Sequence, residues 1–223
     1  MIYNSYIYLI PQYFNNSEID QIEALAGRKE GQVSKIGPSV TDPDAEVTGG
    51  NTDNRIRQGT NKWFEPNELP QNIHDKLWAG TVEAKQSCGW NYDIEYMEPG
   101  QYTIYEEKKD RFTGDFYTWH TDASAQVYDN GMQRKISTCI QLSDPDDYEG
   151  GWFEWIESEP VFNRIKLSDG YLKIDDFIHT IPFSAKAKGS LMVFPAWVHH
   201  QVTPILSGTR KSFITWFCGN PLV

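Results

Sequence analysis

Hydrophobic residues follow a helical spacing in the first part of the chain. One face of the first predicted helix is apolar at Ile19, Ile22, Leu25 and Ala26. Ser17 is placed to cap this helix and Gly27 to end it. A second helix is predicted over about Leu69–Lys85, where Pro70 is tolerated in the first turn. Between these helices the segment Gly37–Thr60 is rich in Gly, Asp, Thr and Asn, which predicts a long surface loop.

From about residue 89 the pattern changes to alternation, which is typical of strands. Apolar or β-branched residues recur at every second position at Tyr92, Ile94 and Tyr96, and again at Ile136, Thr138, Ile140 and Leu142. Further short strands are predicted over Leu191–Phe194 and Lys211–Phe217. Many short strands, with helices confined to the first third, predict a mainly β (α+β) fold of the sandwich or barrel type. We expect one domain over residues 1–223: a helical buttress over about 1–88 and a jelly-roll core over about 89–223.

Composition narrows the class of protein. The 223 residues are 39% hydrophobic and 14% aromatic, which excludes an intrinsically disordered chain. Twenty Lys and Arg against 31 Asp and Glu give a net charge of −11, so the chain lacks the positive field that nucleic-acid binders use. No apolar run approaches the roughly 20 residues that cross a bilayer, and the first residues lack the features of a signal peptide. Three scattered cysteines suit a reducing compartment, so we expect a cytoplasmic protein with no membrane or nucleic-acid partner.

The stretch Tyr117-Thr-Trp-His120-Thr-Asp122 is the first candidate for chemistry. Residues i and i+2 of an extended strand point to the same side, so His120 and Asp122 can present an imidazole and a carboxylate to one point. The alternative is a surface histidine that is hydrogen-bonded to a neighbouring acid.

A second imidazole comes from the adjacent pair His199 and His200, and Arg210 follows on the next predicted strand. Two imidazoles and one carboxylate on one face of a metal leave open positions, which is the arrangement of non-haem Fe(II) oxygenases. The planar fork of an arginine is suited to the far carboxylate of a dicarboxylic co-substrate.

The chain resembles the prolyl-4-hydroxylase-like group of 2-oxoglutarate- and Fe(II)-dependent oxygenases, in particular its bacterial and phage members. Four blocks carry the resemblance over about Gln101–Trp216: Gln101–Tyr105 with the run Gly114, Tyr117, His120 and Asp122; Arg134–Gly151; Phe194-Pro195 leading to His200-Gln-Val-Thr-Pro204; and Gly208-Thr-Arg210 with Trp216. The resemblance implies a double-stranded β-helix, that is, a jelly roll. It also implies Fe(II) as cofactor, 2-oxoglutarate and O2 as co-substrates, and ascorbate as a further candidate.

The resemblance assigns roles to individual residues. It implies that His120, Asp122 and His200 are the metal ligands, because the family pattern begins at His200; His199 is then a packing or substrate-side residue. Arg210 is expected to bind the far carboxylate of 2-oxoglutarate. Ser212, on the same face of the strand, is expected to add a hydroxyl, and Tyr105 either lines the co-substrate pocket or packs in the core. Three aromatic residues are expected to be structural: Trp216 in the core, His74 in the second helix and His179 in a linker.

The expected function is hydroxylation of a prolyl or other residue in a protein or peptide. The alternatives are hydroxylation of a free amino acid or small metabolite, and a jelly roll that binds its ligand without turnover. The carboxylate of Asp122 argues against the halogenating relatives, in which a small residue takes its place. Gly37–Thr60 and Glu106–Thr113 are expected to be long, mobile loops beside the entrance.

Overall fold

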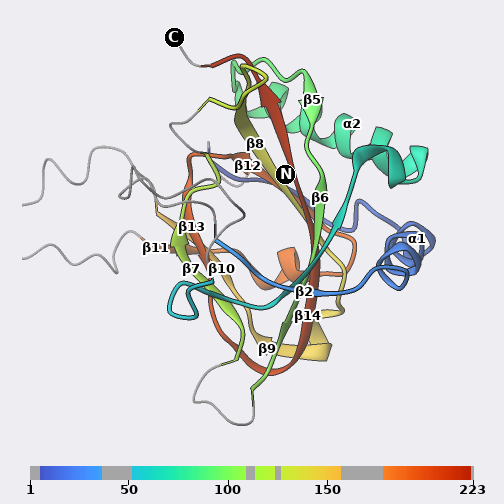
Figure 1. Cartoon of the computed structure of the whole chain (residues 1–223), viewed down its shortest axis with the longest axis vertical. Coiled ribbons are helices and arrows are strands. Elements are labelled where there is room, and N and C mark those ends of the chain that lie inside the picture. Colours follow the sequence, from blue (N-terminus) through green and yellow to red (C-terminus); the bar gives the residue numbers. More distant parts are fainter. Residues whose placement is uncertain (1–5, 37–51, 109–113, 124–126, 157–177, 222–223) are drawn as a thin grey trace, which may run out of the picture.

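The computed structural model describes residues 6–36, 52–108, 114–123, 127–156 and 178–221. Two antiparallel sheets pack face to face, and two helices cover the outer face of the larger sheet (Figure 1). This is the jelly-roll architecture with a helical buttress that the sequence predicts. Within the described residues, neither helix combines the length and the apolar composition that a bilayer span needs.

The larger sheet carries its strands in the spatial order β1-β12-β8-β14-β6-β4-β2. Their bounds are β1 Tyr8–Ile10, β12 Leu191–Pro195, β8 Gln133–Gln141, β14 Ile205–Gly219, β6 Gly100–Glu106, β4 Thr60–Phe64 and β2 Gln32–Val33. Two short strands, β5 (Tyr96–Met97) and β9 (Tyr148–Gly150), also pair with β14. The long β14 therefore pairs with four other strands, β8, β6, β5 and β9.

The smaller sheet has the order β11-β10-β13-β7-β3. Its strands are β11 Ile178–Thr180, β10 Phe153–Ile156, β13 His199–Val202, β7 Phe116–His120 and β3 Arg57–Gln58. Three short 3-10 helices lie in the connections: η1 Pro66–Glu68, η2 Pro145–Asp147 and η5 Phe183–Lys186.

The two helices form close to where the sequence places them. Helix α1 spans Asn16–Ala26, but its cap is Asn15 rather than Ser17. The Asn15 side chain accepts from the backbone N–H of Glu18 while the Glu18 carboxylate accepts from that of Asn15, a reciprocal pair that Ser17 is too late in the chain to make. Helix α2 spans Gln71–Cys88, so Pro70 precedes it, and Gly89 ends it with φ +68°.

Strand alternation divides the side chains of the larger sheet between two cores. Phe213 and Phe217 of β14 point to the helices and share a cluster with Ile22 and Leu77. The other parity of β14 faces the smaller sheet. Between the sheets a second cluster is built around Phe153, Trp155, Met192, Phe194 and Val198.

Three expectations about irregular segments need correction. The predicted loop Gly37–Thr60 contains β3 and the start of β4, while its part 37–51 lies outside the described residues. Of the predicted alternation from Tyr92, only Tyr96 and Met97 form a strand, and this strand pairs with Phe217 and Cys218 at the end of β14. His179 lies on β11, not in a linker, and its ring stacks on Trp155 at 5.3 Å. Of Glu106–Thr113, residues 109–113 lie outside the described residues.

Candidate functional site

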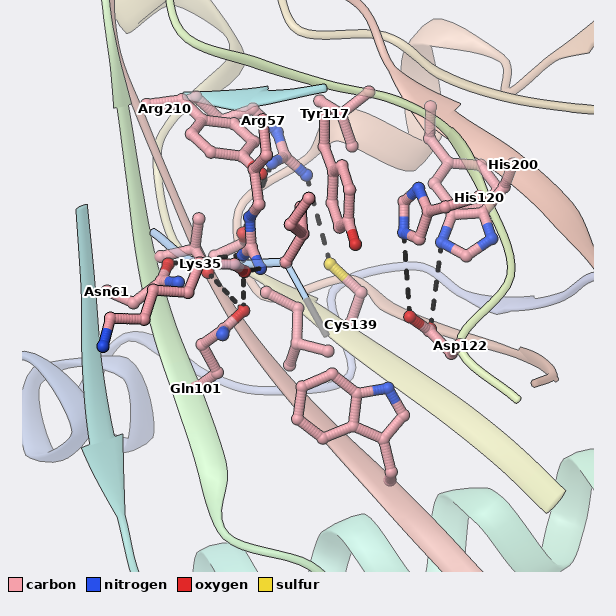
Figure 2. A pocket seen from close by; sticks show the side chains of 18 of the residues that line it. Lys35, Arg57, Asn61, Gln101, Tyr117, His120, Asp122, Cys139, His200 and Arg210 are labelled. Carbon is pink, nitrogen blue, oxygen red and sulfur yellow. Dashed lines mark hydrogen bonds and ion pairs between the residues drawn. The ribbon is translucent and has the colours of Figure 1, made fainter. Parts of the chain in front are cut away.

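A cavity of about 360 Å³ opens between the two sheets (Figure 2). Its larger-sheet wall is formed by alternate residues of β14 and of β6: Arg210, Ser212, Ile214 and Trp216, and Gln101, Thr103 and Tyr105. The opposite wall comes from the smaller sheet, with Arg57, Tyr117, His120 and His200. The cavity therefore brings together side chains that are up to 184 positions apart in the sequence, from Gln32 to Trp216.

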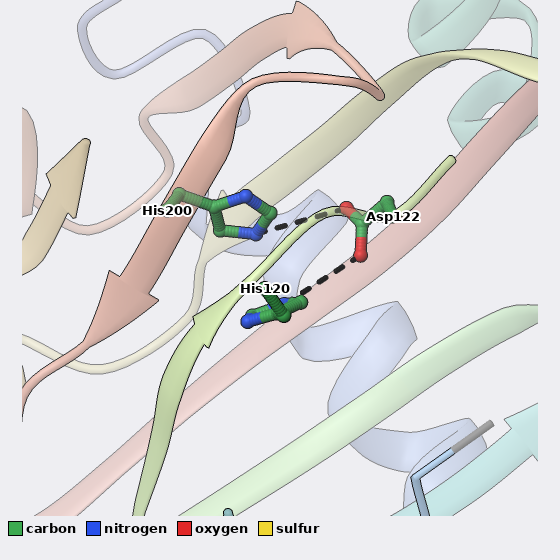
Figure 3. Close-up of side chains that lie close together, drawn as sticks. All are labelled: His120, Asp122 and His200. Carbon is green, nitrogen blue, oxygen red and sulfur yellow. Dashed lines mark ion pairs between the residues drawn. The ribbon is translucent and has the colours of Figure 1, made fainter. Parts of the chain in front are cut away.

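Three ligand-type side chains converge at one end of the cavity (Figure 3). His120 ends β7, His200 is its direct partner on β13, and Asp122 follows two residues after His120. Asp122 Oδ1 lies 3.7 Å from His120 Nε2, and its Oδ2 lies 3.8 Å from His200 Nε2. One donor atom from each residue lies within 4.8 Å of the others. The structure thus brings together the three residues that the sequence singles out.

Backbone carbonyls determine which nitrogen of each imidazole is free. His120 Nδ1 is 2.7 Å from the Thr118 carbonyl oxygen, and His200 Nδ1 is 2.8 Å from that of Val198. A carbonyl only accepts, so Nδ1 carries the proton and donates it, and Nε2 of the neutral ring presents a lone pair. Two lone pairs and a carboxylate then meet with no proton between them. A cation at that point resolves the arrangement, so the three residues fit a divalent metal.

The charge states of these groups agree with metal binding. Burial, together with the repulsion that His200 exerts when protonated, lowers the pKa of His120 well below its ordinary value. Burial opposes ionisation of Asp122, but the neighbouring His200, His120 and Arg134, and a hydrogen bond from Ser137, hold its pKa below the usual value. Ser137 Oγ donates to Asp122 Oδ2 at 2.7 Å. The result is a neutral imidazole beside an ionised carboxylate, which are the forms that bind metals.

Arg210 lies at the cavity with its charge unmatched. It is 3% exposed; its Nη1 donates to Ser212 Oγ at 3.3 Å and its Nη2 lies 4.0 Å from Cys139 Sγ. Its Nε has no partner in the described part of the chain, and no carboxylate there forms an ion pair with it. A buried, unpaired guanidinium is costly unless an anion binds to it. Gly151 makes room for the Arg210 side chain, because a Cβ on Gly151 would come within 2.9 Å of Arg210 Cδ.

Four further residues were considered from the sequence, namely Tyr105, Trp216, His199 and His74, and of these only Tyr105 and Trp216 line the cavity. Tyr105 is buried, is the cross-strand partner of Arg210 and lines the cavity. Trp216, expected in the core, lines the cavity because it shares the strand parity of Arg210, and no described residue accepts a hydrogen bond from its Nε1. His199 points away from His200: it is exposed and meets Trp119 edge to face at 5.8 Å. His74 lies on α2, as expected.

Sequence reasoning missed a polar group at the far side of the cavity, formed by Arg57, Asn61 and Gln101. Arg57 and Asn61 fall in or beside the segment that was predicted to be a loop. Only Gln101 carried a usable signal, because it shares the alternation of Thr103 and Tyr105 on one strand.

Known proteins similar in sequence to this chain are oxygenases and hydroxylases. Residues 100–218 match the family model described as the 2OG-Fe(II) oxygenase superfamily. A PKHD-type hydroxylase from Shewanella baltica (strain OS155 / ATCC BAA-1091) is 31% identical over 104 residues, which are 46% of this chain and 38% of the relative. A PKHD-type hydroxylase from Colwellia psychrerythraea is 26% identical over 155 residues, 70% of this chain and 57% of the relative. The chain thus spans about two fifths to three fifths of the length of these relatives.

Solved structures share the fold. The viral collagen prolyl hydroxylase from Paramecium Bursaria Chlorella virus-1, in its 2OG complex, superposes with a TM-score of 0.58 at 18% identity and covers 96% of both chains. A prolyl hydroxylase from Trichoplax adhaerens, in complex with a peptide fragment of the hypoxia inducible factor oxygen degradation domain, gives a TM-score of 0.59 at 15% identity. It covers 96% of this chain and 84% of its own.

Proposed function

The chain belongs to the 2OG-Fe(II) oxygenase superfamily, and on that premise we propose that it is an Fe(II)- and 2-oxoglutarate-dependent dioxygenase that hydroxylates a C–H bond of a prolyl or other residue in a protein or peptide. The observation that carries the proposal is the convergence of His120, Asp122 and His200 beside a buried, unpaired Arg210 in one cavity.

In this proposal the metal is held by Nε2 of His120, Nε2 of His200 and the carboxylate of Asp122. The hydrogen bonds from the two Nδ1 atoms and from Ser137 orient these three groups before the metal arrives. Such outer partners fix the tautomer and raise the basicity of the ligand atom. With three protein ligands, the remaining metal positions are left to 2-oxoglutarate and O2.

Arg210 is proposed to bind the far carboxylate of 2-oxoglutarate. Its unpartnered Nε supplies a donor, and burial strengthens a charge-assisted hydrogen bond to a carboxylate. Ser212, which touches the guanidinium, and Tyr105, opposite it on β6, complete this end of the pocket. When Fe(II), 2-oxoglutarate and O2 are bound, the iron centre would supply the oxidation. One oxygen atom of O2 is inserted into the substrate C–H bond, and the other enters succinate as 2-oxoglutarate loses CO2.

The remaining contribution of the chain is position and exclusion of water. Ile214 and Trp216 line the cavity, and Phe153 and Phe194 pack against the ring of His200. These apolar side chains keep the His200 ring in place and restrict water near the ligand atoms.

The substrate class rests on the relatives. Proteins similar to this chain are named PKHD-type hydroxylases, and structures with the same fold are prolyl hydroxylases, one of them solved with a peptide.

We also propose that residues 1–223 act as one domain, since α1 and α2 share a core cluster with β8 and β14. A cytoplasmic site of action is also proposed, supported by the free thiols of Cys88, Cys139 and Cys218.

The test is turnover. The protein is incubated with Fe(II), 2-oxoglutarate, ascorbate and O2 against a panel of proline-containing peptides and of free amino acids, while succinate is measured and products are weighed by mass spectrometry. We expect succinate release coupled to a gain of one oxygen atom on a peptide, and loss of both in Asp122→Ala. Oxygen gain only on a free amino acid would replace the peptide substrate. Absence of any iron-dependent succinate would contradict the enzymatic function.

A further inference from the structure

A second buried arginine faces the cavity, and neither the proposed metal site nor the proposed co-substrate site uses it. Arg57 lies on β3, is 8% exposed and lines the same cavity as Arg210. Its guanidinium lies over the ring of Tyr117, 4.5 Å from the ring centroid. The ring of His120, three residues further along β7, also stacks on Tyr117, with centroids 3.4 Å apart. The Tyr117 ring therefore separates Arg57 from the metal-binding histidine (Figure 2).

Neutral oxygens hold this guanidinium, and they leave part of it free. Arg57 Nη2 donates to Gln101 Oε1 at 2.7 Å and more weakly to Asn61 Oδ1 at 3.4 Å, and Nη1 donates to the Lys35 carbonyl at 3.1 Å. Arg57 Nε has no partner, and among the described residues no carboxylate forms an ion pair with this arginine. An arginine has five N–H donors. The contacts therefore position the side chain without neutralising it.

A third arginine at the cavity, Arg134, differs from Arg57 because it has a carboxylate partner. Arg134 also lines the cavity, but Glu98 pairs with it through Nε and Nη2, at 2.6 Å for the shorter ion-pair contact. The chain thus compensates a buried guanidinium where it serves structure. At Arg57, as at Arg210, no described residue supplies the compensating anion. A buried charge of this kind is retained at a cost unless a ligand supplies the anion.

We propose that Arg57, positioned by Gln101 and Asn61, binds a carboxylate of the prime substrate. This inference rests on the proposed function, in which Arg210 takes the far carboxylate of 2-oxoglutarate and leaves Arg57 for the second substrate. The carboxylate is either the main-chain acid of a free amino acid or the side chain of an acidic residue in a peptide. Both present the same two oxygens to a guanidinium, so the experiment distinguishes them by the size of the probe.

The test is direct binding without turnover. Protein loaded with Zn(II), which has no redox chemistry, and with 2-oxoglutarate is titrated calorimetrically with matched acids and amides. The probes are N-acetylated amino acids and acetylated peptides that contain one Asp or Glu, each against its carboxamide, Asn or Gln counterpart. We expect at least one acid to bind about ten-fold or more tightly than its amide, as losing a buried charge pair implies.

Two variants test the role of the Arg57 charge: one removes the charge and the other neutralises it with an internal acid. Arg57→Gln deletes the guanidinium, whereas Gln101→Glu keeps it and places an internal acid 2.7 Å from its Nη2. Both are expected to abolish the preference for the acid while leaving 2-oxoglutarate affinity within about three-fold of wild type. Because Gln101→Glu preserves the size and the accepting oxygen of the side chain, it tests the inference even where Arg57→Gln fails to fold. Arg55→Gln is the matched control: its exposed side chain pairs with Asp53 two residues away, and the preference is expected to persist.

Three results would overturn the inference: no acid preferred over its amide by the wild type, a preference that survives both variants, or a loss of 2-oxoglutarate binding in Arg57→Gln as large as in Arg210→Ala. The last result would assign Arg57 to the co-substrate. Wild-type protein that prefers an acid through Arg57 but binds no 2-oxoglutarate would keep this inference and contradict the proposed function.

Discussion

His120 and His200 are direct partners across β7 and β13, and their ring centroids lie 4.2 Å apart. The pairing register of the smaller sheet, and not closeness in sequence, therefore brings the two imidazoles together. The register slips by one residue between this pair and the Tyr117–Val202 pair, and strand pairing with such a slip changes which side chains face the cavity.

The first prediction follows from that register. His200→Ala, His120→Ala and Asp122→Ala are each expected to abolish tight Fe(II) binding, because each removes one of the three converging side chains proposed as ligands. His199→Ala is the matched control and is expected to keep the metal, because the His199 ring is exposed and faces Trp119. Metal content after dialysis against Fe(II) measures the outcome. Metal retained in His200→Ala but lost in His199→Ala would contradict the ligand assignment.

The hydroxyl of Ser137 gives a second prediction. Ser137→Ala removes the hydrogen bond that Asp122 Oδ2 accepts, and loss of an outer partner of this kind weakens metal binding by about 10- to 100-fold. Thr138→Ser controls for changes in β8, because Thr138 Oγ1 donates to the Thr215 carbonyl instead. Competition with a chelator of known affinity measures both variants. Equal affinities for Ser137→Ala and wild type would show that this hydrogen bond does not orient the carboxylate.

Alternation along the strands made much of the fold predictable. Each residue of β14 points opposite to its neighbours, so placing Arg210 in the cavity also places Ser212, which the sequence analysis inferred. The same parity places Trp216 there, an inference that the aromatic character of the residue obscured by suggesting the core. The bounds of α1 were close because its apolar face and the glycine that ends it are local signals, although its cap is Asn15 and not the predicted Ser17.

The polar group around Arg57 was not predictable for a different reason. β3 has only two residues, too few for any periodicity, and its partner β7 lies about 60 positions further along the chain. Long-range pairing, not local propensity, determines that Arg57 is buried against Tyr117. Likewise, only the tertiary structure shows that Asn61 and Gln101 meet at one guanidinium, since each lies on a different strand.

The third prediction concerns the co-substrate. Arg210→Ala is expected to weaken 2-oxoglutarate binding by about 2–5 kcal/mol, roughly tens- to thousands-fold, because the carboxylate loses a buried charged partner. Arg210→Lys is expected to recover only part of it, since an ammonium lacks the planar fork. The measurement is thermal unfolding of the Zn(II)-loaded protein with and without 2-oxoglutarate. 2-Oxoglutarate is expected to raise the wild-type Tm by mass action, and this shift is expected to vanish in Arg210→Ala. An undiminished shift would exclude Arg210 from the co-substrate site.

The last prediction separates a buried ion pair from an exposed one. Glu98 accepts from Arg134 Nε and Nη2, and the side chains of Arg134 and Glu98 are only 21% and 11% exposed. The guanidinium lies 3.9 Å above the ring of Trp216 at the cavity wall. Glu98→Ala leaves that guanidinium buried without its partner, which costs about 3–5 kcal/mol of the free energy of unfolding. Lys29–Glu68 offers the comparison, because it is equally short at 2.6 Å but lies at the surface, where solvent screens it. Urea unfolding of Glu98→Ala and Glu68→Ala is therefore expected to show a large loss for the first and little change for the second. Equal losses would mean that burial does not set the strength of the pair, and that Arg134 can find another acceptor, of which the Asp122 carbonyl at 3.4 Å is the nearest candidate.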